Sequence, residues 1–281
     1  MTSTAQPKEP QAKAPKISGR IRLPYLTKAK SEGRKLTMLT AYDALTAPLL
    51  EQAGVDMLLV GDSLSNVTLG FFSTLSVTLE DMERATAAVA RSTSRAFIVT
   101  DLPFGSYEAS PQEAFYSAER LLRAGAEAVK LEGGIPRAAT IEFLVNAGIP
   151  VMGHLGYTPQ AEHMLGGPSL QGKGKQAKQM LEDAKAIAEA GAFGVVLEMV
   201  PASLAQEITA TVPIPTIGIG AGAHCDGQVL VWADAMGMGA WAPSFAKRYA
   251  NVGEIITEAA SQYVHEVQSG EFPGPEHSRE A

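Results

Sequence analysis

Short apolar runs alternate with longer amphipathic stretches along most of the chain. The runs are rich in aliphatic and β-branched residues, which is typical of strands buried on both faces of a parallel sheet. Seven such strands are predicted at Leu36–Leu39, Met57–Val60, Phe97–Val99, Ala128–Leu131, Val151–Gly153, Gly194–Leu197 and Thr216–Ile219, and an eighth is expected near Ala240. Seven or eight strand–helix units favour an α/β fold with a single (β/α)8 barrel, or TIM barrel, over an open doubly wound sheet.

The amphipathic stretches between the runs carry their apolar residues on one stripe, as helices packed on a sheet do. The clearest are Leu79–Arg91, Pro111–Arg123 and Lys175–Ala190. Glycine is the usual residue just past a helix, because it takes the left-handed conformation without a Cβ clash. Four Ala-Gly pairs therefore predict helix ends, at Ala53-Gly54, Ala124-Gly125, Ala147-Gly148 and Ala190-Gly191.

After each Ala-Gly pair, the next apolar run leads to residues able to do chemistry. These are Asp62, then Lys130 with Glu132, then His154, and finally Glu198. In a parallel barrel the carboxyl ends of all strands lie on one face, where the loops surround a common pocket. The pattern therefore predicts an enzyme whose site lies at that face.

The 281-residue length suits one barrel domain, expected at residues 21–270. Residues 1–20 are rich in Pro, Lys, Ala, Gln and Thr and predict a disordered tail. They lack the apolar stretch of a secretory signal, and their basic bias leaves an organellar transit peptide as the alternative. Residues 271–281, which include Phe272-Pro273-Gly274-Pro275, are expected to form a second solvated tail.

The amino-acid composition disfavours some classes of binding partner. Hydrophobic residues make up 46% of the chain, which suits a large core, and no run approaches the length of a membrane helix, so a soluble protein is expected. The net charge of −7 disfavours nucleic acid and anionic membranes and leaves small-molecule substrates. Cys225 is the single cysteine, which excludes an intramolecular disulfide and a thiolate metal cluster and fits a reducing cytoplasm.

Three acidic residues follow successive predicted strands. Asp62, Asp101 and Glu132 would form an oxygen-rich site of the kind that a hard cation such as Mg²⁺ prefers. Either aspartate alone could instead cap the next helix, which is common at such turns. Three acids on three neighbouring strands favour the metal site.

Three further residues are candidates for acid–base chemistry or substrate binding. Lys130 lies two positions before Glu132, so both side chains point to the same side of their strand. The pair could serve the pocket or form a salt bridge that holds the barrel together. His154 lies between glycines that would let a ligand approach, although a lone histidine is more often structural. Glu198 has apolar neighbours at Met199–Pro201, which suits a general base.

A glycine-rich run follows the seventh predicted strand, at Gly218-Ile219-Gly220-Ala221-Gly222. Its spacing differs from the dinucleotide-binding fingerprint, and no acidic residue follows at the required distance. The run could cradle a phosphate or allow a tight turn, and both interpretations stay open.

Seven motifs occur in order along the chain. They are Thr40-Ala41-Tyr42-Asp43, Val60-Gly61-Asp62-Ser63, Asp101-Leu102-Pro103-Phe104, Val129-Lys130-Leu131-Glu132-Gly133-Gly134, Gly153-His154-Leu155-Gly156-Tyr157-Thr158-Pro159-Gln160, Gly218-Ile219-Gly220-Ala221-Gly222 and Asp226-Gly227-Gln228. Together they resemble the ketopantoate hydroxymethyltransferase family over roughly Ile21 to Ser278. The ordered set is far more specific than any single motif.

The resemblance implies a (β/α)8 barrel that assembles as a homodecamer, a pentamer of dimers. It implies that the enzyme moves a hydroxymethyl group from 5,10-methylenetetrahydrofolate to 3-methyl-2-oxobutanoate through an enolate, giving 2-dehydropantoate in pantothenate biosynthesis. The implied Mg²⁺ ligands are Asp62 and Asp101, with Glu132 near the metal through water. Ser63, Lys130 and His154, with the two aspartates, are implied to hold the keto acid, and Glu198 to be the base.

The chain departs from the family pattern at a few positions. Ala44 stands where an aromatic residue is usual, Pro168–Lys173 differs from the usual lid sequence, and Arg279 continues the chain beyond the usual end. None of these positions is a proposed ligand or base. The alternatives are a Mg²⁺-dependent 2-oxo acid lyase or mutase of the isocitrate lyase/phosphoenolpyruvate mutase type and a non-catalytic barrel. The first class usually carries a catalytic cysteine loop, and Cys225 lies in the wrong context for one.

Overall fold

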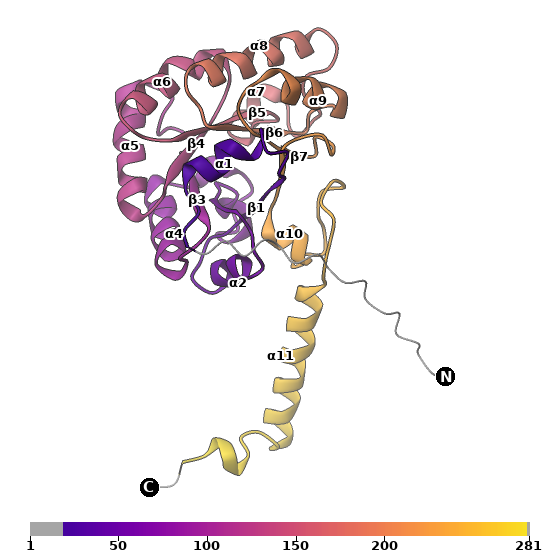
Figure 1. Ribbon diagram of the computed structural model, residues 1–281. Helices are drawn as coiled ribbons and strands as arrows, with labels where there is room; N and C mark the ends of the chain where they lie inside the picture. The colour runs from indigo at the N-terminus through magenta and orange to yellow at the C-terminus, as the bar shows by residue number, and fades with distance from the viewer. Residues whose placement is uncertain (1–18, 280–281) are drawn as a thin grey trace.

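The computed structural model describes residues 19–279 and contains a closed barrel of eight parallel strands (Figure 1). Each strand pairs with the next one in the chain, and the last pairs with the first. The strands are β1 Leu36–Thr40, β2 Met57–Val60, β3 Phe97–Asp101, β4 Ala128–Glu132, β5 Val151–Gly156, β6 Gly194–Glu198, β7 Thr216–Ile219 and β8 Gly227–Leu230. The predicted (β/α)8 barrel is therefore confirmed. Residues 1–18 of the predicted N-terminal tail lie outside the described residues. Arg20, also predicted to lie in the tail, forms an ion pair with Glu127.

The seven predicted strands are all present, and five of them continue past their predicted ends. β3 and β6, for example, end at Asp101 and Glu198 instead of at the preceding apolar residues. The hydrophobic pattern stops at the first polar side chain, whereas the hydrogen-bonded ladder continues into the face that carries the polar groups. The extensions therefore carry residues of the candidate site.

The eighth strand was predicted in the wrong place. No strand lies near Ala240, and β8 is formed by Gly227–Leu230. β8 pairs with β1, and the outward-facing partners Thr37 and Gln228 are both exposed. Because one face of this strand meets solvent, its sequence alternates and lacks the continuous apolar run that marks a strand buried on both faces.

Helices surround the barrel (Figure 1). They are α1 Leu23–Ala29, α2 Thr46–Gln52, α3 Leu64–Val67, α4 Leu79–Ser92, α5 Pro111–Ala124, α6 Ala138–Asn146, α7 Glu162–Leu165, α8 Gln176–Glu189, α9 Ala202–Thr211, α10 Trp232–Met236 and α11 Val252–Ser269, with short 3-10 turns η1 Thr74–Ser76, η2 Ile135–Arg137, η3 Pro159–Ala161 and η4 Pro275–His277. The three clearest predicted helices match α4, α5 and α8 to within one residue at each end. The four glycines predicted as helix ends, Gly54, Gly125, Gly148 and Gly191, all have φ between 87° and 114°.

Two apolar cores hold these layers together. One lies between the outer face of the strands and the helices and includes Leu58, Ile98 and Ile187. The other fills the barrel interior with side chains such as Met57 and Met152, and α1 packs against it through Leu26. The barrel is therefore a packed scaffold, and its polar groups are left at the carboxyl ends of the strands.

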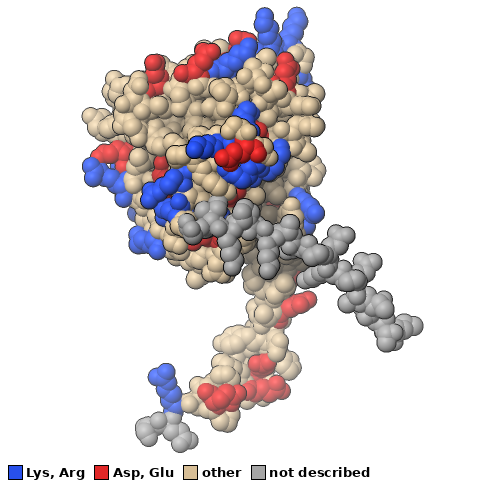
Figure 2. Space-filling model, in the orientation of Figure 1, with Lys and Arg blue, Asp and Glu red and all other residues tan. Residues whose placement is uncertain are grey.

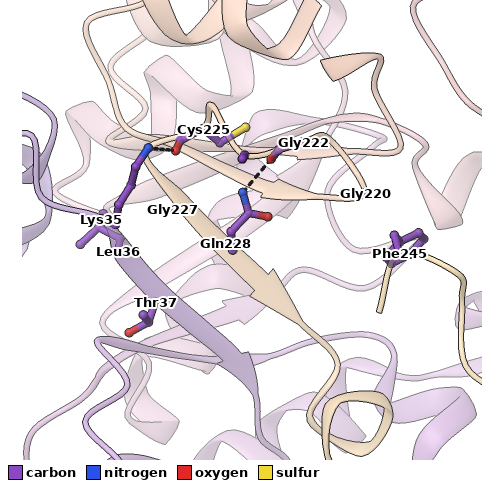
Figure 3. A pocket seen from close by; sticks show the side chains of 10 residues that line it. Lys35, Leu36, Thr37, Gly220, Gly222, Cys225, Gly227, Gln228 and Phe245 are labelled. Carbon is purple, nitrogen blue, oxygen red and sulfur yellow. Dashed lines mark hydrogen bonds between the residues drawn. The ribbon is translucent and has the colours of Figure 1, made fainter. Parts of the chain in front are cut away.

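The surface beside β7, β8 and β1 is hollowed. The loop at residues 220–226 joins β7 to β8 directly, without the helix that connects most other pairs of strands. A hollow of about 710 Å³ lies here, and Lys35, Cys225, Gln228 and Phe245 are among its lining residues (Figure 3). We call this surface the open flank.

The long helix α11 extends away from the barrel (Figure 1), and none of its residues is buried. It exposes large apolar side chains, which are Ile255, Ile256, Tyr263, Val264 and Val267. α11 contains Glu254, Glu258 and Glu266 and no Lys or Arg, and the face in Figure 2 shows acidic side chains between uncharged ones along it. We call α11 with the following residues to 279 the arm. No helix within residues 19–279 combines the length and hydropathy needed to cross a membrane.

Candidate active site

The structure brings all six predicted chemical residues to the carboxyl ends of five neighbouring strands, β2 to β6. Asp62 follows β2, Asp101 ends β3, and Lys130 and Glu132 lie on β4. His154 lies on β5 and Glu198 ends β6. Five of the six are buried, whereas the Glu198 side chain keeps 17% of its surface exposed. Glu198 is therefore the most exposed carboxylate of the group.

Asp101 and Lys130 form the centre of the cluster. The strands place them directly opposite each other, and Lys130 Nζ lies 3.1 Å from Asp101 Oδ1. The other oxygen, Asp101 Oδ2, accepts a hydrogen bond from the backbone N–H of Asp62 at 3.0 Å. Burial lowers the pKa of Lys130, but the charges of Asp101, Asp62 and Glu132 outweigh this and raise it. Lys130 is therefore an ammonium ion.

His154 connects two carboxylates. Its Nδ1 lies 3.3 Å from Glu132 Oε1, and its Nε2 lies 3.2 Å from Glu198 Oε2. Burial and the charge of Lys130 lower the pKa of His154, but the hydrogen bonds to Glu132 and Glu198 outweigh them and raise it to about 9. The ring is therefore an imidazolium at neutral pH, which holds the Glu198 carboxylate in place.

The cluster carries more negative than positive groups. Burial, followed by the charges of Asp101 and Glu132, raises the pKa of Asp62 to about 7. Burial is also the main reason that the pKa of Asp101 is raised, although Lys130 opposes it. Four carboxylates face two cationic side chains, so the fully ionised cluster has a net charge of −2. A divalent cation would neutralise this excess.

The oxygens are not already arranged as a metal cage. Within residues 19–279, no three or more His, Cys, Asp and Glu side chains converge on one point suited to a metal ion. Each carboxylate is held instead by a protein donor, for example Asp62 by Gln160 and Asp101 by Lys130. The charge and donor type of the cluster fit a hard cation, and the Gln160 bond to Asp62 Oδ2 leaves Asp62 Oδ1 to contact one.

Three site residues were not predicted from the sequence. Tyr42 OH lies 2.8 Å from Ser63 Oγ and so holds the hydroxyl of Ser63, the residue just before α3. Gln160, in the 3-10 turn η3, donates to the Asp62 carboxylate, and Tyr107, in the loop after β3, donates to Gln160 Oε1; both side chains are buried. Tyr42 and Gln160 lie within two of the family motifs, so the motifs could have indicated both residues. No sequence signal indicated Tyr107, because it lies in a loop without a periodic pattern.

The glycines around His154 face protein atoms instead of an open ligand site. A Cβ on Gly153 would meet Ile187 of α8. Gly156 has φ of +99°, and a Cβ there would clash with the backbone carbonyl of Glu198. These glycines let β5 and β6 approach closely, which brings His154 to Glu198. The expectation that they leave room for a ligand was wrong.

The backbone turns sharply directly after Glu198. Met199 is the one non-glycine residue with positive φ, at 47°, in the described part of the chain. Its N–H donates to Ile219 O, and its own carbonyl accepts from Gln171 N–H, both at 2.9 Å. These bonds hold the left-handed turn, which costs about 1–2 kcal/mol for a residue with a Cβ. The backbone is therefore held on both sides of Met199, which fixes the direction in which the chain leaves β6.

The glycine run after β7 favours the tight-turn interpretation. Gly220 and Gly222 have positive φ values of 61° and 81°. A Cβ on Gly220 would meet Phe245, and one on Gly222 would meet Ala202. The run therefore packs against protein atoms and turns the chain onto the open flank.

Comparisons with known proteins show the family of this chain. The family model for ketopantoate hydroxymethyltransferase matches residues 20–275. The 3-methyl-2-oxobutanoate hydroxymethyltransferase of Leifsonia xyli subsp. xyli is 54% identical over 271 residues, which cover 96% of this chain and 97% of the relative. The enzyme of the same name from Pyrobaculum calidifontis is 54% identical over 261 residues, covering 92% and 98%.

Solved structures with lower identity share the fold. Phosphonopyruvate hydrolase in complex with oxalate and Mg²⁺ matches with a TM-score of 0.58 and 13% identity, covering 91% of this chain and 92% of that one. A 2,3-dimethylmalate lyase of the PEP mutase/isocitrate lyase superfamily matches with a TM-score of 0.56 and 14% identity, covering 90% and 92%. With a buried acidic cluster at the strand ends and a match over nearly its whole length, this chain is an enzyme that belongs to the ketopantoate hydroxymethyltransferase family.

Proposed function

We propose that this enzyme transfers a hydroxymethyl group from 5,10-methylenetetrahydrofolate to 3-methyl-2-oxobutanoate. Water supplies the hydroxyl oxygen, and the products are 2-dehydropantoate, for pantothenate biosynthesis, and tetrahydrofolate. The observation that carries the proposal is the 54% identity to enzymes named for this reaction over almost the full chain. The folate carries the one-carbon unit, while the protein provides orientation and electrostatics.

Asp62 and Asp101 would hold Mg²⁺, with Glu132 close enough to act through water. The excess negative charge of the buried cluster supports this role, as does the raised pKa of Asp62. The Mg²⁺ in the related phosphonopyruvate hydrolase fold adds support. When bound, Mg²⁺ would polarise the 2-oxo group of the keto acid and make its C3–H more acidic.

Lys130, His154 and Ser63 would bind the keto acid. Lys130 Nζ and the His154 ring lie 3.3 Å apart and are both cationic, which suits the carboxylate and the oxygen that gains negative charge. Ser63 adds a hydroxyl whose position is set by Tyr42. Because these groups are already fixed by the barrel, they need little reorganisation during the reaction.

Glu198 would remove the C3 proton. Its carboxylate is partly exposed, whereas the other three are buried, and its Oε2 is oriented by His154 Nε2. The bond to the imidazolium leaves its second oxygen, Oε1, to accept a proton. C3 of the keto acid then forms the new bond to the one-carbon unit, whose two C–N bonds to the folate break. The oxygen of water becomes the hydroxyl, and the proton taken from C3 and one proton of water end on the two folate nitrogens.

The experiment that tests the reaction combines purified enzyme, Mg²⁺ and both substrates. Formation of 2-dehydropantoate, detected by mass spectrometry, is expected only when methylenetetrahydrofolate is present. Cleavage of 2,3-dimethylmalate or phosphonopyruvate without hydroxymethyl transfer would support the lyase or mutase alternative. Cys225 weighs against that alternative, because it is buried beside the open flank and away from the carboxylate cluster.

We also infer that the enzyme assembles as a homodecamer, a pentamer of dimers, in the cytoplasm. The arm and the open flank both leave apolar surface without cover in a single chain. Exposed apolar patches of this kind mark contacts with other subunits. Leu45 and Leu49 of α2, 83% and 64% exposed, add a further patch.

Light scattering is expected to report a particle of about ten times the 29.6 kDa chain mass. Ile256→Glu places a charge on the apolar face of the arm and should reduce that mass. Glu258→Gln changes a charged residue of the same helix and is the matched control, which should leave the mass unchanged. A monomer with full activity would contradict the assembly and leave the reaction untouched.

A further inference from the structure

Gln160 connects two carboxylates that come from different strands. It lies in η3, after β5, and its side chain is buried. Its Nε2 donates to Asp62 Oδ2 at 2.9 Å, and its backbone N–H donates to Glu132 Oε2 at 3.1 Å. One residue of the β5 loop therefore reaches both the β2 and the β4 member of the acidic cluster.

The orientation of the Gln160 amide is fixed by its other partners. Nε2 also donates to the backbone carbonyl of Leu102 at 3.0 Å, and a carbonyl can only accept. Oε1 accepts from Tyr107 OH at 2.6 Å. The Tyr107 oxygen in turn accepts from the backbone N–H of Glu132 at 3.3 Å. Reversing the amide would turn Oε1 toward the Leu102 carbonyl and lose the bonds to Leu102 and Asp62, so Leu102 determines which group faces Asp62, and Tyr107 holds Oε1.

We infer that Gln160 is a positioning residue that sets the orientation of Asp62 and Glu132 for a divalent cation, with Tyr107 holding the Gln160 amide. The inference rests on the proposed metal site. Gln160 occupies Asp62 Oδ2 and Glu132 Oε2, which restricts the rotation of both carboxylates. The groups that orient metal ligands typically contribute ten- to hundredfold to metal affinity.

A different result is expected if Gln160 has a purely structural role. If its bonds only anchored the η3 loop to Leu102, substitution would lower thermal stability and leave the affinity for a cation unchanged. Gln160→Met keeps the length of the side chain and removes every amide hydrogen bond. Tyr107→Phe removes only the hydroxyl that holds Oε1, so it disturbs the fold less.

The test is a titration of the metal-free full-length enzyme with Mn²⁺, without substrates, followed by the electron paramagnetic resonance signal of free Mn²⁺. Gln160→Met is expected to weaken binding about ten- to hundredfold. Tyr107→Phe should weaken it by a smaller factor. Gln206→Met, on the exposed side of α9, is the matched control and should bind as wild type does. In the activity assay, Gln160→Met should need more Mg²⁺ for half-maximal rate and regain most of kcat at saturating Mg²⁺.

Asp62→Asn in the same titration separates this inference from the proposed metal site. If Asp62→Asn also binds Mn²⁺ as wild type does, the proposed site itself is wrong. If Asp62→Asn loses binding while folded Gln160→Met keeps wild-type affinity, only the positioning role is overturned. Should Gln160→Met fail to fold by circular dichroism, wild-type affinity in Tyr107→Phe overturns the role instead.

Discussion

Replacing either Asp62 or Asp101 by alanine is expected to abolish turnover through the loss of Mg²⁺. Both carboxylates lie in a buried cluster whose negative charge exceeds its positive charge. A hard cation depends on anionic oxygen ligands, so removing one of two aspartates takes away most of its charge compensation. Isothermal titration calorimetry with Mg²⁺ measures the effect directly, and wild-type binding by both variants would place the metal elsewhere.

Asparagine variants are the matched controls for these deletions. Asp101→Ala leaves Lys130 buried without its ion-pair partner, and breaking a buried pair in this way costs about 3–5 kcal/mol. Asp101→Asn keeps the shape and an oxygen acceptor for Lys130, while it removes the charge. Thermal unfolding of both variants then shows whether a loss of activity reflects the cation or the fold.

Glu198→Gln is expected to slow exchange of the C3 proton of 3-methyl-2-oxobutanoate at least about a hundredfold, the lower end of what a positioned general base contributes. Proton removal precedes attack on the methylene, so wild-type enzyme with Mg²⁺ in D₂O should exchange this proton even without folate. The amide keeps the shape of Glu198 and cannot accept the proton as the carboxylate does. Loss of the C3–H signal in proton NMR gives the rate.

The same variant should still bind Mg²⁺ and the keto acid, because Glu198 meets the acidic cluster through the His154 ring, which lies between Glu198 and Glu132. If the variant binds Mg²⁺ and the keto acid but exchanges the C3 proton slowly, Glu198 acts as the base and is not a metal or substrate ligand. Exchange at the wild-type rate would exclude Glu198 as the base and leave a water molecule as the acceptor.

The positions of the strands and of the chemical residues were predictable because both leave local signals. Aliphatic runs mark strands buried on both faces, and the polar residues that follow them mark the carboxyl face. The same logic failed for β8, where Gln228 faces solvent and interrupts the run. It also ended β3 and β6 too early, because Asp101 and Glu198 belong to their strands.

The network around the carboxylates was not predictable from local pattern. Gln160 and Asp62 are 98 positions apart, and Gln160 and Tyr107 are 53 apart. Their contacts depend on how loops after three different strands fold over the pocket, and such loops carry no periodicity. The family motif included Gln160 without indicating which atoms it would bind.

The barrel can close only after the residues of the acidic cluster have been synthesised. Every residue of the acidic cluster lies between Asp62 and Glu198, whereas the ring closes through Leu36–Leu39 pairing with Gly227–Leu230. This contact joins nearly opposite ends of the barrel sequence, and contacts of such long range form slowly because a large loop must first be closed. A nascent chain that has emerged only as far as Glu198 therefore contains every side chain of the buried acidic cluster, yet it lacks the closed ring that holds them together.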